Sequence, residues 1–411
     1  MIPLRLDKLP PLGELEADAE TVTGVQVDSR RIGPGDLFVA VGRGIDFLDD
    51  ARANGAAATL VPERPFEAFA ALGSLVRDRS SAKVVGITGS TGKTSTKDIL
   101  AALCAPAART VAAEASYNNE IGVPLTLCRL EPETEVCILE LAMRGYGQIA
   151  DLCRIARPHI GVVVNVGPVH LELVGSLEGV MRAKSELVAA LPSGGTAIVP
   201  AEFPVEREDI DVVRLREPDA RREDGRTIVD GVSFSFSAQH QAANAAAALA
   251  AYDALGLPRR ERVDVEFSRW RGEELPLAGG GLLINDAYNA NPVSMRAALV
   301  HLAAAAGARR RVAILGDMAE LGAGGPVYHE EVGREVARHG VEALLAVGEL
   351  ARGYLDGASG VPLKRWAPDA DAATTEATRL VEPGDCVLVK ASRAVGLERV
   401  ADALRGAAVS A

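Results

Sequence analysis

The pattern of apolar and polar residues becomes regular from Val84 onward. Apolar runs of strand length fall at residues 83–87, 135–141, 159–166 and 195–200. Between these runs, residues 93–105, 177–191 and 240–256 have apolar positions at intervals of three and four. This pattern predicts strands and helices in turn, which is typical of a parallel sheet covered by helices.

The flanking segments predict two further α/β units. Near Arg271 a second alternating series begins, with strand-like runs at 281–286, 311–317, 341–348 and 385–392. The first 82 residues hold shorter runs, at 36–41 and 57–61, and end in a polar stretch. We therefore predict three domains, 1–82, 83–268 and 269–411, as expected for a chain longer than one core usually supports. The weakly patterned segment 201–235 is expected to be a surface excursion.

Composition narrows the classes of function. The chain has 411 residues and a formal net charge of −12, which argues against general affinity for nucleic acid or anionic membranes. No apolar run approaches the roughly 18 residues of a membrane span, and none has signal-peptide character. The five cysteines form no C-x-x-C pair, so we expect reduced core residues in a cytoplasmic protein.

The strongest motif is "KVVGITGSTGKTSTKDIL", in which a strand runs into a glycine-rich turn and then a helix. Loop amides and the helix N-terminus can cradle a polyphosphate, Lys93 can reach its terminal oxygens, and the Thr94 hydroxyl can bind Mg²⁺. The glycines are spaced by three, and Ile87 stands where the generic phosphate-loop pattern has glycine. The alternative is a glycine turn with an exposed lysine, which does not explain the strand and helix on either side.

Two polar residues follow predicted strands and are candidate metal ligands. Glu140 directly follows the apolar run Val136 to Leu139, and His170 follows the run of 159–166 by a short turn, on the same side of the sheet. The carboxyl ends of parallel strands share one edge of a sheet, where α/β proteins bind ligands. A carboxylate and an imidazole there can ligate a metal. The alternatives are a solvated glutamate just past its strand and a hydrogen-bonded loop histidine.

Lys184 falls within the apolar stripe of the helix predicted at 177–191. The stripe comprises Leu177, Val180, Met181, Leu187, Val188 and Leu191. A lysine in this position either extends its ammonium to water or is buried, and burial favours the neutral amine. A neutral amine can react with carbon dioxide to give a carbamate, an anion able to meet a metal. We prefer the carbamate over the extended lysine.

Together these motifs resemble the Mur ligases, the ATP-dependent amide ligases of peptidoglycan precursor synthesis. The resemblance covers nearly the whole chain and is carried by "TGSTGKTS", "NVGPVHLELVGSLEGVMRAKSEL", "HQAANAAAALAA", "NDAYNANPVSMRAAL", "ILGDMAELG" and "VLVKASRAVGLERV". It implies an α/β protein of three domains. These are a small N-terminal module for the UDP-muramyl peptide, a central parallel-sheet domain with the phosphate loop, and a Rossmann-like C-terminal domain for the acceptor.

The resemblance implies a reaction and its partners. UDP-N-acetylmuramoyl-tripeptide and D-alanyl-D-alanine would be joined with hydrolysis of ATP to ADP and phosphate, through an acyl phosphate. Mg²⁺ and carbon dioxide, as a carbamate on Lys184, would be cofactors. We expect a monomer with no nucleic-acid partner and no membrane insertion, serving cell-wall synthesis and so cell shape and division. Trp270 stands where the family usually has glycine, which predicts a stiffer hinge before the last domain.

The resemblance also implies roles for particular residues. Catalytic roles are implied for Lys93, Glu140, His170 and Lys184, and metal ligation for Thr94, Glu140, His170 and Lys184. Contact with the muramyl peptide is implied for Ser29, Arg30, Asn118 and Asn119. Nucleotide contacts are implied for Gly89, Ser90, Thr91, Gly92, Lys93, Thr94, Ser95, Asn244, Arg271, Asp286, Tyr288, Asn289 and Asn291. The plainer alternatives are a strand-to-helix turn capped by asparagine in "DAYNANP" and a turn pair at 118–119.

Other functions remain possible from the motifs alone. A phosphate loop also serves kinases and ATP-driven conformational switches, but neither explains Lys184 or "DAYNANP". The ligase of the preceding peptidoglycan step, or a folylpolyglutamate synthetase-like enzyme, shares the central motifs and differs in the outer domains.

Overall fold

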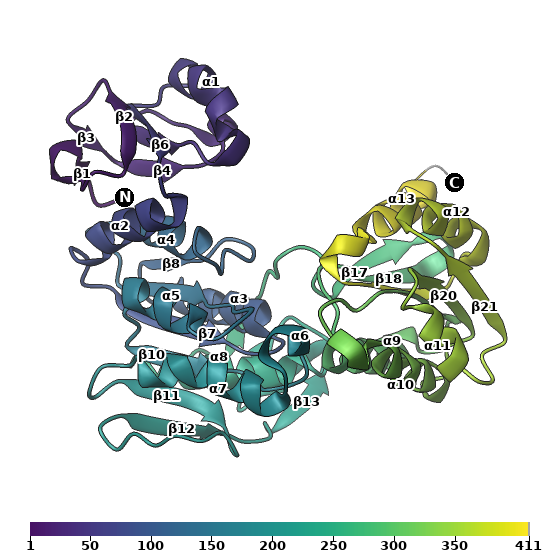
Figure 1. Cartoon of the computed structure of the whole chain (residues 1–411). Helices are drawn as coiled ribbons and strands as arrows, with labels where there is room; N and C mark the ends of the chain where they lie inside the picture. Colours follow the sequence, from purple (N-terminus) through teal and green to yellow (C-terminus); the bar gives the residue numbers. More distant parts are fainter. Residues whose placement is uncertain (410–411) are drawn as a thin grey trace.

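The computed structural model describes residues 1–409 and contains three α/β units, each built on its own sheet (Figure 1). The predicted last domain extends to residue 411, so its two final residues lie outside the described part. The domain boundaries at 82 and 268 stay predictions. The arrangement is open: the first unit lies above the central one, and the last unit lies to its side, apart from the first (Figure 1).

The first unit has a four-stranded sheet in the order β2-β6-β5-β4, in which β2 alone is antiparallel to its neighbour. The strands are β2 (Gly13–Ala17), β4 (Gly24–Gln26), β5 (Asp36–Val39) and β6 (Ala58–Pro62). A short pair, β1 (Leu4–Arg5) and β3 (Thr21–Val22), and the helices α1 (Leu48–Ala53) and α2 (Pro65–Arg77) complete it. The strands predicted at 36–41 and 57–61 are confirmed.

The central unit has six parallel strands in the order β12-β11-β10-β7-β9-β8. They are β7 (Lys83–Thr88), β8 (Thr110–Ala112), β9 (Val136–Glu140), β10 (Ile160–Val163), β11 (Thr196–Pro200) and β12 (Asp211–Leu215). One face is covered by α3 (Lys93–Cys104) and α8 (Gln241–Ala254). The other is covered by α4 (Gly122–Leu127), α5 (Gln148–Ala156) and α7 (Leu177–Ala189), with α6 (Leu171–Val174) leading into α7. The predicted parallel sheet is confirmed.

The last unit has the strand order β17-β18-β22-β19-β20-β21, in which only the edge strand β17 is antiparallel. The strands are β17 (Glu273–Leu277), β18 (Gly281–Asp286), β19 (Arg311–Gly316), β20 (Ala343–Val347), β21 (Leu363–Ala367) and β22 (Cys386–Lys390). One face carries α9 (Pro292–Ala306), α10 (Gly325–Arg338) and α11 (Arg352–Gly357). The other carries α12 (Ala370–Leu380) and α13 (Glu398–Val409).

One expectation from the pattern is incomplete and one is wrong. Segment 201–235 lies mostly at the surface, as predicted, but it also adds β12 to the edge of the central sheet and forms three strands of a separate small sheet. These are β13 (Ala220–Glu223), β14 (Arg226–Val229) and β15 (Val232–Phe234), joined by β16 (Arg262–Val263). Edge strands such as β12 expose both faces in part, which hides the alternation. Leu177 is also not part of the buried stripe, since it is 47% exposed at the start of α7.

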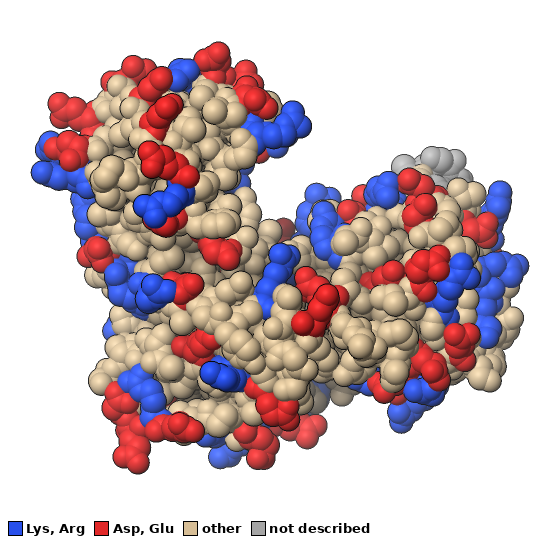
Figure 2. All heavy atoms as spheres, in the orientation of Figure 1, with Lys and Arg blue, Asp and Glu red and all other residues tan. Residues whose placement is uncertain are grey.

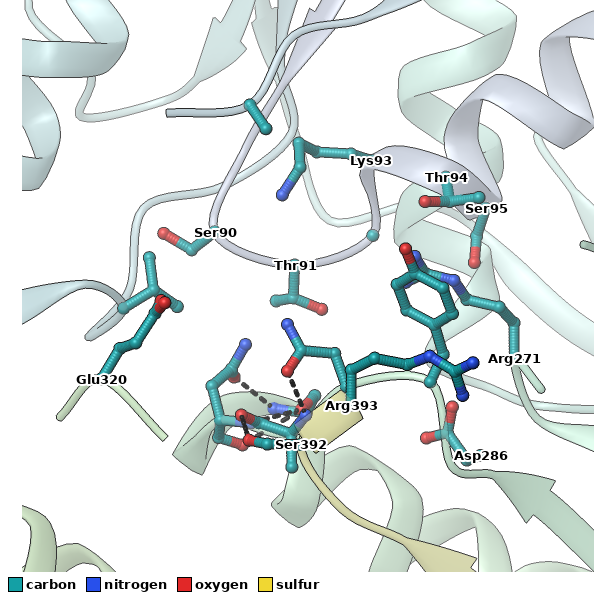
Figure 3. A pocket seen from close by; sticks show the side chains of 18 of the residues that line it. Ser90, Thr91, Lys93, Thr94, Ser95, Arg271, Asp286, Glu320, Ser392 and Arg393 are labelled. Carbon is teal, nitrogen blue, oxygen red and sulfur yellow. Dashed lines mark hydrogen bonds between the residues drawn. The ribbon is translucent and has the colours of Figure 1, made fainter. Parts of the chain in front are cut away.

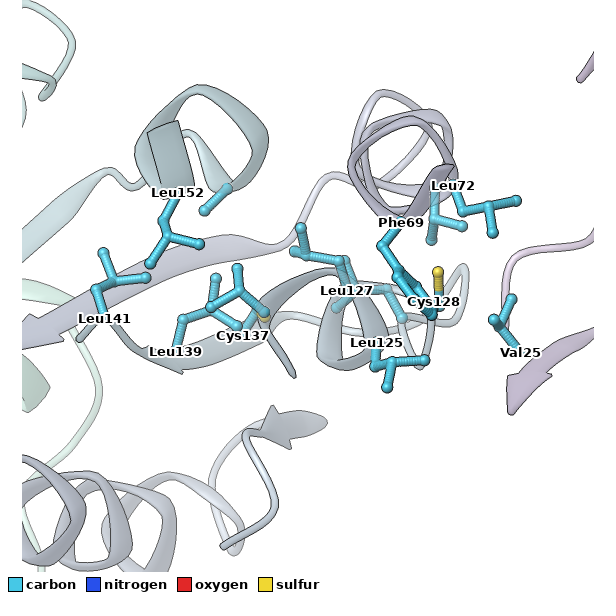
Figure 4. Close-up of a cluster of buried hydrophobic side chains, with 14 of the residues drawn as sticks. Val25, Phe69, Leu72, Leu125, Leu127, Cys128, Cys137, Leu139, Leu141 and Leu152 are labelled. Atoms are coloured by element: carbon cyan, nitrogen blue, oxygen red, sulfur yellow. The ribbon is translucent and has the colours of Figure 1, made fainter. Parts of the chain in front are cut away.

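The first and central units share one apolar core (Figure 4). Val25 of β4 and Phe69 and Leu72 of α2 belong to the same buried cluster as Leu127 of α4 and Leu139 of β9. This continuous burial of apolar area stabilises the orientation of the first unit on the central one. The five cysteines are free and buried, as the sequence predicted.

Candidate active site

A cavity of about 590 Å³ lies where the central and last units meet. We call its two sides the central wall and the C-terminal wall. The central wall is lined by Ser90 to Ser95, Asn118, Glu140, Ala142 to Arg144, Val169, His170, His240, Gln241 and Asn244. The C-terminal wall is lined by Arg271, Asp286, Tyr288 to Asn291, Ser294, Ala297, Ala319 to Leu321, Lys390 and Ser392 to Ala394 (Figure 3).

The phosphate loop forms the centre of the central wall. The chain leaves β7 and enters α3 at Gly92, which has a left-handed φ of 79°. A Cβ there would lie 2.2 Å from Oδ1 of Asn244, so only glycine allows this approach of loop and helix. The Lys93 ammonium donates to the carbonyl of Gly89 at 2.9 Å and lies across the turn. Burial lowers the pKa of Lys93, while Glu140 opposes that shift.

A polar cluster lies at the carboxyl end of β9. The Thr94 hydroxyl donates to Oε2 of Glu140 at 2.7 Å, and the Asn118 amide donates to Oε1 at 2.8 Å. Glu140 is only 1% exposed, so it is not a solvated residue past its strand. A hydroxyl and a carboxylate side by side, facing the phosphate loop, match the oxygen ligands that Mg²⁺ prefers. These residues therefore fit the expected metal.

Lys184 lies behind this wall and does not line the cavity. Its side chain is 2% exposed on α7, between Val180, Ala183 and Leu187, so the alternative of an ammonium extended into water is wrong. Burial, and secondarily the charge of Lys93, holds the pKa of Lys184 well below its usual range. We find no hydrogen bond or ion pair for Lys184 within residues 1–409. A buried neutral amine of this kind is the form able to react with carbon dioxide.

His170 caps α6 in a left-handed conformation, with a φ of 53°, and lines the cavity. Its Nδ1 forms a hydrogen bond with Oε2 of Glu320, which belongs to the C-terminal wall. Burial lowers the pKa of His170, although the neighbouring carboxylate of Glu320 opposes the shift. In this structure His170 is thus a hydrogen-bonded loop histidine, and ligation of a metal stays a prediction.

The start of α8 forms a second polar cluster on the central wall. The Asn244 amide donates to Oε1 of Gln241 at 2.8 Å, and both residues are buried. The Nδ1 atom of His240 is buried and has no hydrogen-bond partner among the described residues. An unpaired buried polar atom carries a free-energy cost that a ligand can remove.

The C-terminal wall is organised by cations. The Arg271 guanidinium lies 3.9 Å from the ring centre of Tyr288 and donates to Ser116 of the central unit at 3.0 Å. Its Nε is buried and unpaired within the described chain, which suits a site for a phosphorylated ligand. Lys390 is 2% exposed and bonds to Asp286 at 2.6 Å and to the carbonyl of Asn289 at 2.9 Å.

Several predicted residues have local structural roles. The Asn291 side chain caps α9 in a capping box with Ser294, as the plainer alternative for "DAYNANP" proposed, although both also line the cavity. Oδ1 of Asn119 accepts from the amides of Ile121 and Gly122, outside the cavity. At 118–119, therefore, only Asn118 faces the predicted site.

The predicted muramyl-peptide contacts in the first unit lie apart from this cavity. Ser29 is buried, and its carbonyl accepts a hydrogen bond from the Asn54 side-chain amide at 3.0 Å. Arg30 is exposed and pairs with Asp28 at 2.7 Å. The space-filling view shows a wide notch between the first and last units, with acidic and basic side chains mixed around it (Figure 2). The roles of both residues stay predictions.

Sequence reasoning missed three charged residues of the C-terminal wall: Glu320, Lys390 and Arg393. All three fall in stretches that carried the family resemblance, "ILGDMAELG" and "VLVKASRAVGLERV". A charged residue directly after an apolar strand, as in Lys390 after Cys386–Val389, is the signal that also pointed to Glu140.

Comparison with known proteins is consistent with this site. Residues 87–252 match the Mur ligase middle domain, and residues 270–393 match the glutamate ligase domain of the Mur ligases. A UDP-N-acetylmuramoyl-tripeptide–D-alanyl-D-alanine ligase from Escherichia coli is 34% identical, over 98% of this chain and 99% of the relative. The chain belongs to the Mur ligase family. A ligase of the same name from Synechocystis is also 34% identical, over 93% and 92% of the two chains.

Solved structures agree with this assignment. MurF from Acinetobacter baumannii matches with a TM-score of 0.82 and 27% identity, over 96% of each chain. MurF ligase from Thermotoga maritima, solved in complex with ADP, matches with a TM-score of 0.76 and 28% identity, over 95% and 98% of the two chains. FolC from E. coli, solved in complex with DHPP and ADP, is 18% identical, with a TM-score of 0.61, and shows a shared fold only. No helix within residues 1–409 is long and apolar enough to cross a membrane.

Proposed function

We propose that this chain is the ATP-dependent ligase that joins D-alanyl-D-alanine to UDP-N-acetylmuramoyl-tripeptide, giving UDP-N-acetylmuramoyl-pentapeptide, ADP and phosphate. The observation that carries the proposal is 34% identity over nearly the full length to ligases of that name. The cavity supports it, because a phosphate loop faces a second polar wall across it.

The proposed reaction has two steps. A carboxylate oxygen of the tripeptide attacks the γ-phosphorus of ATP, the bond to the β,γ-bridging oxygen breaks, and ADP leaves. The amine of D-alanyl-D-alanine then attacks the acyl carbon, loses a proton, and expels inorganic phosphate. Both steps develop negative charge on oxygen, so preorganised cations lower their barriers.

The central wall supplies the charges for these steps. The Lys93 ammonium would move from the Gly89 carbonyl to the terminal phosphate oxygens, and loop amides would hold the others. Thr94 and Glu140 would hold Mg²⁺, which when bound neutralises phosphate charge. Ser90, Thr91 and Ser95 would complete the phosphate cradle. No side-chain nucleophile is needed.

We further propose that Lys184 is carbamylated. Its carbamate, with Glu140 and His170, would complete a second metal site behind the phosphate loop. Burial of Lys184 and its lowered pKa support this, because they favour the amine that reacts with carbon dioxide.

The carbamate can be tested by chemical rescue. Lys184→Ala should lose turnover that short carboxylic acids partly restore by supplying the missing anion. Lys184→Arg keeps a cation and should stay inactive even with added acid. Retention of most turnover by both variants, without any response to acid, would contradict the carbamate.

The C-terminal wall would close over the nucleotide. Arg271 and Asn244 approach the cavity from opposite walls and would contact the nucleotide, while Asp286, Tyr288, Asn289 and Asn291 would form its far side. The unpaired Nε of Arg271 and Nδ1 of His240 support this placement, since a nucleotide could satisfy both. Consumption of ATP and the reduced cysteines support a cytoplasmic location.

The assay that tests the overall proposal is acceptor-dependent ADP release. We expect release only when UDP-N-acetylmuramoyl-tripeptide and D-alanyl-D-alanine are both present. Stimulation by a single amino acid would instead support the ligase of the preceding step, and stimulation by a folate with glutamate would support a folylpolyglutamate synthetase. ADP release without any acceptor would support an ATP-driven switch.

A further inference from the structure

Glu320 makes a contact between the two walls that the proposed reaction does not use. It follows β19 in the stretch "ILGDMAELG" and points into the cavity from the C-terminal wall (Figure 3). Its Oε2 contacts Nδ1 of His170, and its Oε1 lies 3.8 Å from Nε of Arg144. Both partners belong to the central wall, so a single carboxylate of the last unit binds two residues of the central one.

The geometry fixes the proton on the His170 ring. A carboxylate oxygen accepts hydrogen bonds, so His170 is protonated at Nδ1 and donates this N–H to Glu320. In a neutral ring this leaves the lone pair on Nε2. Histidines that ligate metals nearly always donate their other ring N–H to a carboxylate or carbonyl, which sets the tautomer and the ring orientation. Glu320 and His170 already have this arrangement.

The backbone on both sides of the contact has an uncommon conformation. Glu320 has a φ of 61° and His170 a φ of 53°, both in the left-handed region that residues other than glycine rarely adopt. Such conformations cost about 1 to 2 kcal/mol each and persist where surrounding interactions require them. Two residues with this conformation are joined by one hydrogen bond, which indicates that the backbone of each wall holds its own side of the bond in place.

We propose that Glu320 is a positioning residue that sets the tautomer and orientation of His170 for the metal site. Because Glu320 belongs to the last unit, His170 keeps the tautomer and orientation suited to metal binding only while that unit is docked on the central one. Formation of the metal site is thereby coupled to the arrangement of the two units. The inference rests on the proposed function for the identity of the metal site, but its first test does not.

The first test measures the tautomer of His170 in the ligand-free protein. The chain has six histidines, so a ¹⁵N spectrum of imidazole nitrogens is simple, and His170→Gln assigns one set of signals. We expect the Nδ1–H form in the unmodified chain and a shift toward Nε2–H in Glu320→Ala. Arg144→Ala, the matched control, removes the other partner of Glu320 and should leave the His170 signals unchanged.

The second test measures metal affinity directly. Mn²⁺ binding is followed by electron paramagnetic resonance with a non-hydrolysable ATP analogue present. Glu320→Ala should weaken the weaker of two Mn²⁺ sites by roughly 10- to 100-fold, as loss of such a hydrogen-bonded partner does elsewhere. Arg144→Ala should leave both sites unchanged.

Three results would overturn the inference. The first is an Nε2–H tautomer of His170 in the unmodified chain. The second is an equal loss of Mn²⁺ affinity in Glu320→Ala and Arg144→Ala. The third is binding of a single Mn²⁺ with an affinity that neither substitution changes. Failure of the proposed function has a different signature, because ADP release would then not depend on D-alanyl-D-alanine even where Glu320 sets the His170 tautomer.

Discussion

The two walls of the cavity are built in different ways. On the central wall, Thr94 at the start of α3 and Asn118 both donate to Glu140, which ends β9, an inner strand of the parallel sheet. On the C-terminal wall, Asp286 and Lys390 pair within their own unit. Side-chain contacts between the walls include those of Glu320 and of Arg271 with Ser116. The phosphate site is therefore preorganised by residues of the central wall alone. The C-terminal wall is added to it only when the last unit docks on the central unit.

The largest expected effect follows from removing the central cation. Lys93→Ala should reduce kcat by at least about 1,000-fold, because the ammonium acts on charge that develops in the transition state. The circular dichroism spectrum and melting temperature should change little, since the side chain packs across a loop and not within the core. The readout is acceptor-dependent ADP release. Near-normal turnover in this variant would refute the assignment of the nucleotide site to the central wall.

Removal of the buried lysine of the C-terminal wall should lower the free energy of unfolding. Lys390→Ala leaves Asp286 without its partner at 2.6 Å, and loss of one member of a largely buried pair typically costs about 3 kcal/mol. We expect a loss near this size in the free energy of unfolding, measured by urea denaturation. Lys364→Ala on β21 is the control, because Lys364 is exposed and should change stability by less than about 0.5 kcal/mol. Equal effects of both changes would show that the Asp286 pair does not organise this wall.

These effects also show what the sequence could and could not predict. The residues after β7 and β9 were found because a phosphate loop and a strand-terminal carboxylate are local signals. Glu320 was not found, since its partner His170 is 150 positions away and their contact depends on how two units dock. The buried position of Lys184 could be anticipated because its charge interrupts an apolar stripe, whereas Leu177 belongs to the same stripe and is exposed. Periodicity fixes the face of a helix but not where burial ends.

A pH effect should arise where the walls meet. Burial lowers the pKa of His240 to about 4, with Asp286 opposing the shift and His301 and Lys390 adding to it. The folded pKa lies below the usual value of about 6.5 in an unfolded chain, so the unfolded chain binds the proton first. The contribution of His240 to the free energy of unfolding is therefore complete above about pH 6.5 and is lost as the pH falls toward 4. Between pH 7.5 and 5 the free energy of unfolding should drop by about 2 kcal/mol from this residue.

Replacement of the histidine tests this assignment. His240→Gln should remove most of that pH dependence in urea denaturation curves. His339→Gln, at the end of α10 and outside the cavity, should leave it unchanged. A pH dependence unaffected by His240→Gln would assign the acid sensitivity to other groups.

The smallest expected effect concerns the hinge between the walls. Trp270 has a left-handed φ of 62°, and its ring lies 4.5 Å from the Arg393 guanidinium and 5.7 Å from that of Arg269. Arg393 lines the cavity, so this stacking ties the hinge to the C-terminal wall. Trp270→Gly relieves the backbone strain and removes the stacking, two effects of about 1 kcal/mol each that oppose one another. The free energy of unfolding should therefore change by less than about 1 kcal/mol.

The arrangement of the two walls should nevertheless change in this variant. A glycine hinge samples more backbone conformations, so small-angle scattering of the free Trp270→Gly protein should show a broader distribution of interatomic distances. ATP analogue and tripeptide substrate should restore the distribution of the unmodified chain, because ligand contacts from both walls then fix the last unit. Arg269→Ala is the matched control, since it removes the more distant stacking partner and keeps the tryptophan backbone. Identical scattering from all three free proteins would show that the Trp270 ring does not restrict the hinge.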